Sequence, residues 1–344
     1  MIKLLALFLS LTFLLALANE DNLEGIKTYL LGQTVALKTA TSELQALSDQ
    51  YFALAESSEF DYEVMWQNNQ AEVTNLIEEA RAAWMKASPL YEEVEGIVAG
   101  TPSLAQFDVD LDAGSSAAED PEGAVSFDIT LPNGDVLEKP GNLFGVTEST
   151  LYGTYEAFSS GVQADLDYDG EMEFGEVLPD ANVLKSSVDL LTQMSGDLDA
   201  AANAWTPTES DAFTALAVMV PTMSEYFGSW RDSRFVLGEA STQRDFVAIS
   251  RLADIQGILG GLQIVHESVS PLIQSVDPEQ DAGIATGLES LKLLVKGVYD
   301  DEQAGKTFTP EEADLLGAEA QNRATAITGQ IVQVASQLNI QIAE

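Results

Sequence analysis

Apolar residues recur at helical spacing along most of the chain. Between residues 20 and 56 they include Leu23, Ile26, Leu30 and Leu37, and no proline intervenes, which predicts one long helix. The segment 61–97 has the same period and predicts a second long helix. The same pattern then predicts helices over 146–158, 181–204, 209–236, 242–275, 278–304 and 309–342. The last begins with Thr309 and Pro310, an N-cap followed by a proline at the first helical position.

The helical pattern is interrupted between residues 100 and 145. Dipeptides typical of turns, containing proline or glycine, recur in this stretch. Within it, SFDITLPNGDVLE alternates around Asn133 and Gly134, as expected of a small β-hairpin. The predicted fold is therefore all-α, with two helical bundles and one loop- and hairpin-rich insertion in the first half.

Two distant segments indicate an internal duplication. AAWMKASPLYEEVE at 82–95 and IVHESVSPLIQSVD at 264–277 share Ser-Pro-Leu and a valine further on. Both segments fall late in predicted long helices. We therefore predict two related helical halves, residues 19–205 and 206–344.

The N-terminus has the features of a secretory signal peptide. Lys3 precedes an apolar run from Leu4 to Leu17, and Ala16-Leu17-Ala18 is a small-x-small cleavage signal. A membrane-spanning helix needs about 20 apolar residues, so an uncleaved anchor is the weaker alternative. We predict that residues 1–18 are removed and that the mature chain is periplasmic or extracellular, without stable insertion in a membrane.

The chain is strongly acidic and contains no cysteine. Lys and Arg number 15 against 56 Asp and Glu, a formal net charge of −41. Such a charge repels nucleic acid and anionic membranes and attracts cations, so no nucleic-acid partner is expected. The absence of cysteine excludes disulfides, thiolate metal sites and cysteine nucleophiles.

The segment DLDYDGEMEFGE at 165–176 fits every diagnostic position of the twelve-residue calcium loop. Acids stand at positions 1, 3, 5 and 12, and Gly170 at position 6 permits the sharp bend. The expected ligands are the side chains of Asp165, Asp167, Asp169 and Glu176, the backbone carbonyl of Glu171, and a direct or water-mediated contact from Glu173. The alternative is a solvated acidic loop. We favour a calcium ion that braces the neighbouring polypeptide.

A second candidate cation site lies in the second long helix. Glu92 and Glu95 stand at i and i+3, so both carboxylates lie on one helical face and attract a cation. The alternative is a solvated acidic face. In the following FDVDLDAG, residues 107–114, either Asp110 or Asp112 is a candidate for a further oxygen ligand.

Several segments resemble a known family. AWMKASPLYEEVEGIV, FDVDLDAG and GNLFGVTESTLYGT resemble the imelysin-like group of secreted helical proteins, which includes the EfeO-type periplasmic iron-uptake components. They look still closer to the iron-assimilating periplasmic proteins of algae, the phytotransferrin-like group. The likeness extends through TMSEYFGSWRDSRFV and covers most of the mature chain. It implies capture of ferric iron and delivery to a membrane permease or receptor.

The resemblance also implies a ligand set. The imelysin group carries His-x-x-Glu on a helix, joined in a metal site by two glutamates one turn apart and an aspartate. The matching residues here are Glu92 and Glu95 for the pair, Asp112 or Asp110 for the aspartate, and Glu148 for the last glutamate. The histidine is missing, because Gly145 occupies its position. Hydrolysis at zinc is thereby disfavoured, and an all-oxygen set suits hard ions such as Fe³⁺, Mn²⁺ or Ca²⁺.

Arginines and tyrosines add candidates around the iron. Arg231 and Arg234 stand at i and i+3 and could hold a small anion; the phytotransferrin resemblance implies carbonate in the iron shell. The alternative is salt bridging to nearby aspartates. Tyr91 and Tyr226 are candidate phenolate ligands of Fe³⁺.

These observations favour a secreted ferric-ion-binding protein that is not an enzyme. Two alternatives stay open. One is an imelysin-type metallopeptidase, against which the missing histidine argues, and the other is a calcium-dependent structural surface protein.

Overall fold

The structure, a computed structural model, describes residues 2–343, with side chains described from Leu23 on. Helices make up 71 % and strands 4 % of it, which confirms the predicted all-α class. The signal-peptide prediction falls on residues 1–18, outside the described side chains. Among the described residues, no helix combines the length and the apolar character that crossing a membrane requires.

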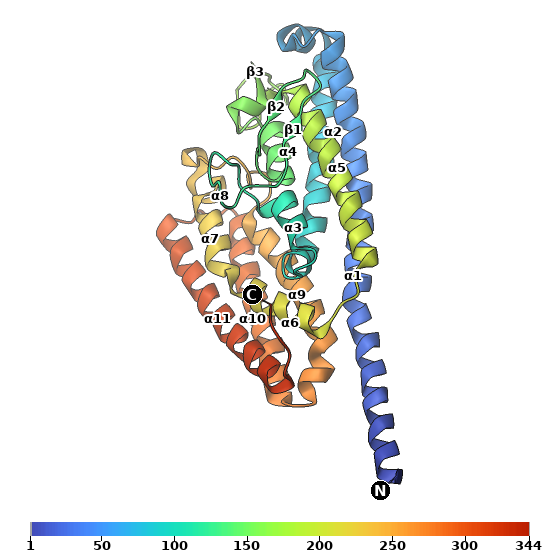
Figure 1. Ribbon diagram of the computed structural model, residues 1–344. Helices are drawn as coiled ribbons and strands as arrows, with labels where there is room; N and C mark the ends of the chain where they lie inside the picture. The colour runs from blue at the N-terminus through green and yellow to red at the C-terminus, as the bar shows by residue number, and fades with distance from the viewer. Residues whose placement is uncertain (1, 344) are drawn as a thin grey trace.

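Three long helices form one side of the molecule (Figure 1). Helix α1 (Ile2–Ser57) runs nearly the full height of the view, and α2 (Tyr62–Val98) returns along it. Helix α5 (Ala181–Ala204) packs along α1 and has the predicted bounds. Apolar residues at helical spacing bury this contact; Leu30, Leu37 and Leu44 of α1 are fully buried.

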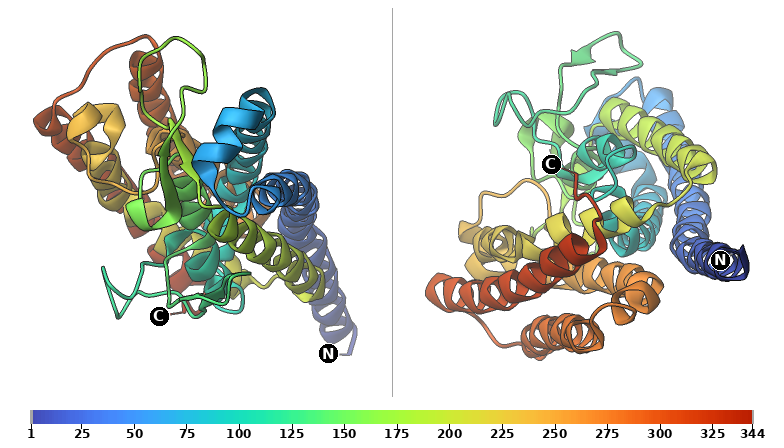
Figure 2. Two further views of the ribbon diagram at one scale, coloured as in Figure 1. Left: turned by 90° about the horizontal axis from the view of Figure 1, so that it is seen from above. Right: turned by 60° about the horizontal axis from the view of Figure 1, so that its bottom comes forward.

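The second half of the chain packs on the other side of α2 (Figure 2). It contains α6 (Glu209–Met219), α7 (Met223–Asp232), α8 (Arg234–Leu237), α9 (Arg251–Gln274), α10 (Pro278–Gln303) and α11 (Pro310–Leu338). Helix α11 begins with the predicted cap, because Thr309 and Glu312 bond reciprocally in a capping box. The predicted duplication of the two halves stays a prediction.

Helices α2 and α9 approach each other closely beside the acidic pair of α2. A Cβ at Gly261 would lie 2.4 Å from the Glu93 carbonyl oxygen. Glycine is therefore required at Gly261 for this approach. The close contact holds the start of α9, with Arg251 and Asp254, beside Glu92.

Short elements lie between α2 and α5 along the chain, within its first half. They are α3 (Ala105–Asp108), a π-helical turn (Val109–Ala113), β1 (Ile129–Thr130), β2 (Val136–Leu137), α4 (Leu143–Leu151), β3 (Ser159–Gln163) and β4 (Val177–Pro179). The β1 and β2 strands pair antiparallel, with Gly134 at φ +96°, which confirms the hairpin predicted at Asn133-Gly134. The β3–β4 pair, which the sequence did not predict, encloses the calcium-like loop.

Several predicted helices have different bounds, and the helix predicted over 309–342 already ends at Leu338. The helix predicted over 146–158 is α4, which begins earlier because the Asn142 side chain caps it, and ends at Leu151. The helix predicted over 209–236 is broken at Pro221, which departs from helical dihedrals. The helix predicted over 242–275 starts only at Arg251, and the preceding residues form an irregular segment beside the acidic cluster.

Candidate metal centre

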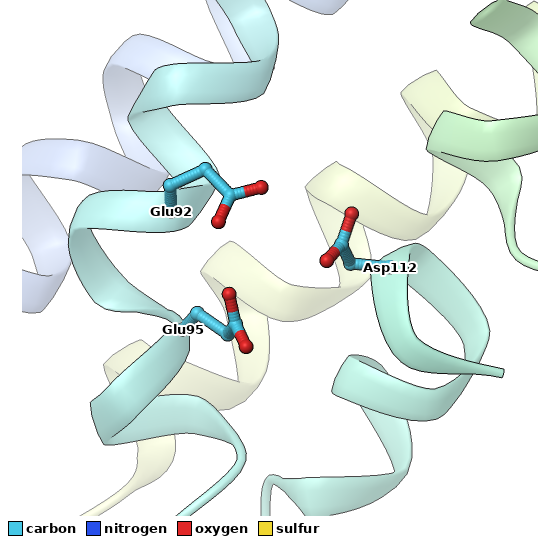
Figure 3. Close-up of side chains that lie close together, drawn as sticks. All are labelled: Glu92, Glu95 and Asp112. Carbon is cyan, nitrogen blue, oxygen red and sulfur yellow. The ribbon is translucent and has the colours of Figure 1, made fainter. Parts of the chain in front are cut away.

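Three buried carboxylates meet where α2 faces the π-helical turn. Glu92, Glu95 and Asp112 each offer an oxygen within 4.8 Å of the others (Figure 3). Each residue is only 3 % exposed. Burying three carboxylates together is costly unless protons or cations compensate them, so this cluster is the first candidate for a metal centre.

Local structure explains which acids reach the cluster. Glu92 and Glu95 lie on one face of α2, as their spacing predicts. The π-helical turn separates Asp110 from Asp112, because Asp110 accepts hydrogen bonds from Ser126 N and Oγ, both at 2.9 Å. Asp112 is therefore the acid of FDVDLDAG that the structure brings to the pair. Single π-helical turns occur frequently at functional sites.

Two oxygens of the cluster lack a hydrogen-bond donor. Glu95 Oε2 and Asp112 Oδ2 are buried and accept no hydrogen bond. Asp112 Oδ2 only faces Arg251 Nη2, at 3.5 Å. Most buried polar atoms in folded proteins have a partner, so each of these oxygens is a position where a cation would be stabilised.

One arginine lies among the acids. Arg251, at the start of α9, is 5 % exposed, and its Nη1 lies 3.4 Å from Glu92 Oε2 and 3.2 Å from Asp254 Oδ2. Its guanidinium carbon is 4.1 Å from the centre of the Phe246 ring. The residue pattern singled out Arg231 and Arg234 as anion ligands and did not single out Arg251. Its position follows from the contact between α2 and α9.

The cluster is short of positive charge. Burial raises the pKa of Glu92 and of the neighbouring Asp108 well above the usual range, even though Arg251 acts in the opposite direction on both. Burial likewise raises the pKa of Asp112 to about 7 and that of Asp254 to about 6. One guanidinium therefore does not compensate all these acids, and without a metal they retain protons more strongly than free carboxylic acids.

Each of the two candidate tyrosines donates a hydrogen bond to a carboxylate. Tyr226 Oη donates to Glu95 Oε1 at 2.6 Å, and Tyr91 Oη donates to Asp108 Oδ1 at 2.8 Å. Burial raises the pKa of both phenols well above 10. In this arrangement the two hydroxyls keep their protons and orient the acids.

A cavity of about 600 Å³ reaches the cluster. Its walls include Glu95, Asp108, Asp112, Tyr226, Arg244 and Arg251. The volume lies within the range of small-ligand sites and provides room for an ion together with its other ligands.

Comparison with protein families identifies the chain. The peptidase M75 model, described as imelysin, matches residues 25–332. This chain belongs to the imelysin family. Imelysin-like proteins are typically secreted or periplasmic and include non-enzymatic iron-uptake members, although the family name denotes a peptidase. A search of curated proteins found no match to this chain.

Glu148 of this chain is not one of the three clustered acids, but it lines a small second cavity together with Glu92 and Asp112. Its carboxylate accepts hydrogen bonds from the backbone nitrogens of Phe246 at 2.6 Å, Val247 at 3.0 Å and Ala248 at 2.8 Å. It is 1 % exposed, and burial raises its pKa to about 8 against the effect of these donors. The resemblance placed Glu148 among the metal ligands, whereas the structure directs both of its oxygens to the backbone.

At Gly145, which stands in place of the family's histidine, a neighbouring side chain fills the space of a side chain. A Cβ at Gly145 would lie 2.5 Å from Asp245 Oδ2. The Asp245 carboxylate therefore takes the space that a side chain at Gly145 would need. The resemblance implies a nitrogen ligand at this position, and in this chain a carboxylate lies beside it instead.

The structure does not bring the two predicted anion-binding arginines to the cluster. Arg231 pairs with Asp232 at 2.7 Å and Asp314 at 2.8 Å near the surface, as the salt-bridge alternative stated. The guanidinium carbon of Arg234 lies 3.3 Å from the centre of the Phe174 ring. The buried arginines that line the cavity are instead Arg244 and Arg251.

The calcium-like loop connects β3 to β4. Asp165, Asp167 and Asp169 offer oxygens within 4.8 Å of one another, and Gly170 has the positive φ of +87° that the sharp bend requires. Glu176 is turned to the backbone, because it accepts from Leu166 N and Glu173 N, both at 2.8 Å. The side chains of Glu171 and Glu173 are exposed.

Proposed function

We propose that this protein captures ferric iron outside the cytoplasm for high-affinity uptake, with Glu92, Glu95 and Asp112 as oxygen ligands. The observation that carries the proposal is the pair of buried carboxylate oxygens without donors, in a cluster that is short of positive charge. Hard ions prefer oxygen ligands, and a trivalent ion would offset the largest part of this charge. The family includes iron-uptake members, which supports the choice of iron.

The surrounding residues would prepare the site for the ion. Tyr226 fixes Glu95, and Arg251 holds Glu92 and Asp112 together until the ion enters. Arg251 Nε is buried without an acceptor. The carbonate that the phytotransferrin resemblance implies is therefore proposed beside Arg251 rather than beside Arg231 or Arg234. Delivery to a membrane permease or receptor completes the proposal.

A titration of the mature protein with Fe³⁺ tests the proposal. It requires a competing chelator to prevent hydrolysis of the ion, saturating Ca²⁺, and parallel samples with and without bicarbonate. We expect one iron per chain and tighter binding with bicarbonate. Binding that bicarbonate leaves unchanged would remove carbonate from the proposal, and failure to bind under both conditions would contradict iron capture.

Peptidase activity is the alternative that the family name offers. The chain's single histidine, His266, lies 3.1 Å from Asp281 between α9 and α10 and does not line the cavity. A cluster of oxygens alone is unlike the nitrogen-containing sites of zinc peptidases. Proteolysis of casein that depends on added metal would favour this alternative over iron capture.

We further propose that Ca²⁺ binds the 165–176 loop and braces the β3–β4 connection. At about 100 times its dissociation constant, Ca²⁺ should stabilise the fold by about 2.7 kcal/mol, or roughly 5 °C in melting temperature. Asp165→Ala should abolish this gain, because it removes the first ligand of the loop. Asp197→Ala, at an exposed position of α5, is the matched control and should keep the gain. An equal Ca²⁺ response in both variants would count against the loop.

A further inference from the structure

One buried carboxylate holds an irregular segment next to the metal cavity. Glu148, in α4, accepts from three consecutive backbone amides, those of Phe246, Val247 and Ala248. We call Phe246–Ala248 the latch segment. These three hydrogen bonds supply the order that helical hydrogen bonds would otherwise provide for this segment.

The latch segment has a backbone conformation that needs external support. Phe246 has φ +55°, in the left-handed region that residues with bulky side chains rarely adopt. Such a conformation persists when surrounding contacts hold it in place. The Glu148 carboxylate, which accepts from Phe246 N at 2.6 Å, provides that contact at the strained residue itself.

The latch segment also contacts the residues that organise the acidic cluster. The Phe246 ring lies against Arg251, 4.1 Å from its guanidinium carbon, and Arg251 contacts Glu92 and Asp112. Arg244 and Asp245, directly before the segment, line the same cavity as Glu95 and Asp112. A continuous set of contacts therefore leads from Glu148 through Phe246 and Arg251 to the cluster.

We propose that Glu148 is a positioning residue that fastens the latch segment as a wall of the metal cavity and so slows the release of the bound ion. Glu148 acts through Phe246 and Arg251 and does not ligate the ion. This inference rests on the proposed capture of iron. It gives Glu148, which the family resemblance matches to a metal ligand, a role different from that of Glu92 and Glu95.

Amide hydrogen exchange of the metal-free protein tests the latch. In Glu148→Gln, one acceptor oxygen becomes an amide nitrogen that faces backbone donors. Exchange at residues 246–248 should therefore accelerate by about tenfold or more, the equivalent of about 1.4 kcal/mol. The matched control is Asp180→Asn, because the Asp180 carboxylate also accepts backbone hydrogen bonds, from Asn182 and Val183, and lies outside both proposed ion sites. It should leave exchange at 246–248 unchanged.

The release of iron tests the consequence for function. Transfer of Fe³⁺ from the loaded protein to an excess chelator should be about tenfold faster in Glu148→Gln than in the parent or in Asp180→Asn. Phe246→Leu keeps Glu148 but removes the ring from Arg251, and should also accelerate release. X-ray absorption of loaded Glu148→Gln should show the same number of oxygen neighbours around iron as in the parent.

The possible results distinguish a failure of the proposed role of Glu148 from a failure of the proposed iron capture. If the parent does not bind iron, the proposed function fails, and exchange still reports whether Glu148 orders the segment. If the parent binds iron but Glu148→Gln releases it at the parental rate, the proposal that Glu148 slows the release of iron is contradicted. A loss of one oxygen neighbour in Glu148→Gln would instead make Glu148 a ligand and would also overturn the inference.

Discussion

The double variant Glu95→Gln with Asp112→Asn should bind Fe³⁺ at least roughly 1000-fold more weakly than the parent, a loss of about 4 kcal/mol. Both changes keep the shape of the side chain but remove the two oxygens that accept no hydrogen bond. Amides neither carry the negative charge nor match the carboxylate as ligands of a hard ion. Competition against a ferric chelator at fixed pH measures the loss.

The same double variant should not be destabilised without metal. Burial raises the pKa of Asp112 to about 7, so the parent stabilises the uncharged form of this acid, which an asparagine resembles. The melting temperature without metal should equal or exceed that of the parent. The matched control is Glu93→Gln, a neighbour in α2 whose side chain accepts from Gln33 on α1, and it should keep parental affinity. Parental affinity in the double variant would contradict the assigned centre.

Arg251→Met should lower the free energy of unfolding at pH 8 by about 3–5 kcal/mol, because it leaves Glu92, Asp112 and Asp254 without the cation that they face. Chemical unfolding of the metal-free protein measures the effect. The matched control is Arg231→Met, which breaks exposed ion pairs with Asp232 and Asp314 and should cost less than about 1 kcal/mol.

The loss caused by Arg251→Met should depend on pH. Burial raises the pKa of Asp112 to about 7 and that of Asp254 to about 6, whereas the pKa of an aspartate in an unfolded chain is about 4. The folded parent therefore binds more protons than the unfolded chain in this window, and its stability falls as pH rises from ~4 to ~7. Without Arg251 these pKa values rise further, so the additional loss appears mainly above pH 7.

At pH 5 both acids are protonated in the folded parent and in the folded variant, so the loss should be less than half of that at pH 8. If Arg251→Met lowers the free energy of unfolding equally at pH 5 and at pH 8, Arg251 stabilises the fold by packing alone. A bound trivalent ion should also reduce the loss, since it supplies the missing positive charge.

The sequence by itself determined the local features of this protein. Residue spacing alone places Glu92 and Glu95 on one face of α2, because a helix repeats every 3.6 residues. The bounds of α5, the cap of α11 at Thr309 and the turn at Gly134 likewise depend on hydrogen bonds between residues only a few positions apart. Such bonds form in nearly the same way in any surrounding.

Only the tertiary structure decided which distant residues complete the site. Arg251 lies 159 positions from Glu92 along the chain, and the close contact of α2 with α9 at Gly261 brings them together. Glu148 carries no local signal for its partners, which are amides about 100 residues away. Spacing favoured Arg231 and Arg234 rather than Arg251, because a periodic pattern gives the face of a helix but not the neighbour that the face meets. That choice follows from packing of the whole chain, which buries some charges beside partners and leaves others in solvent.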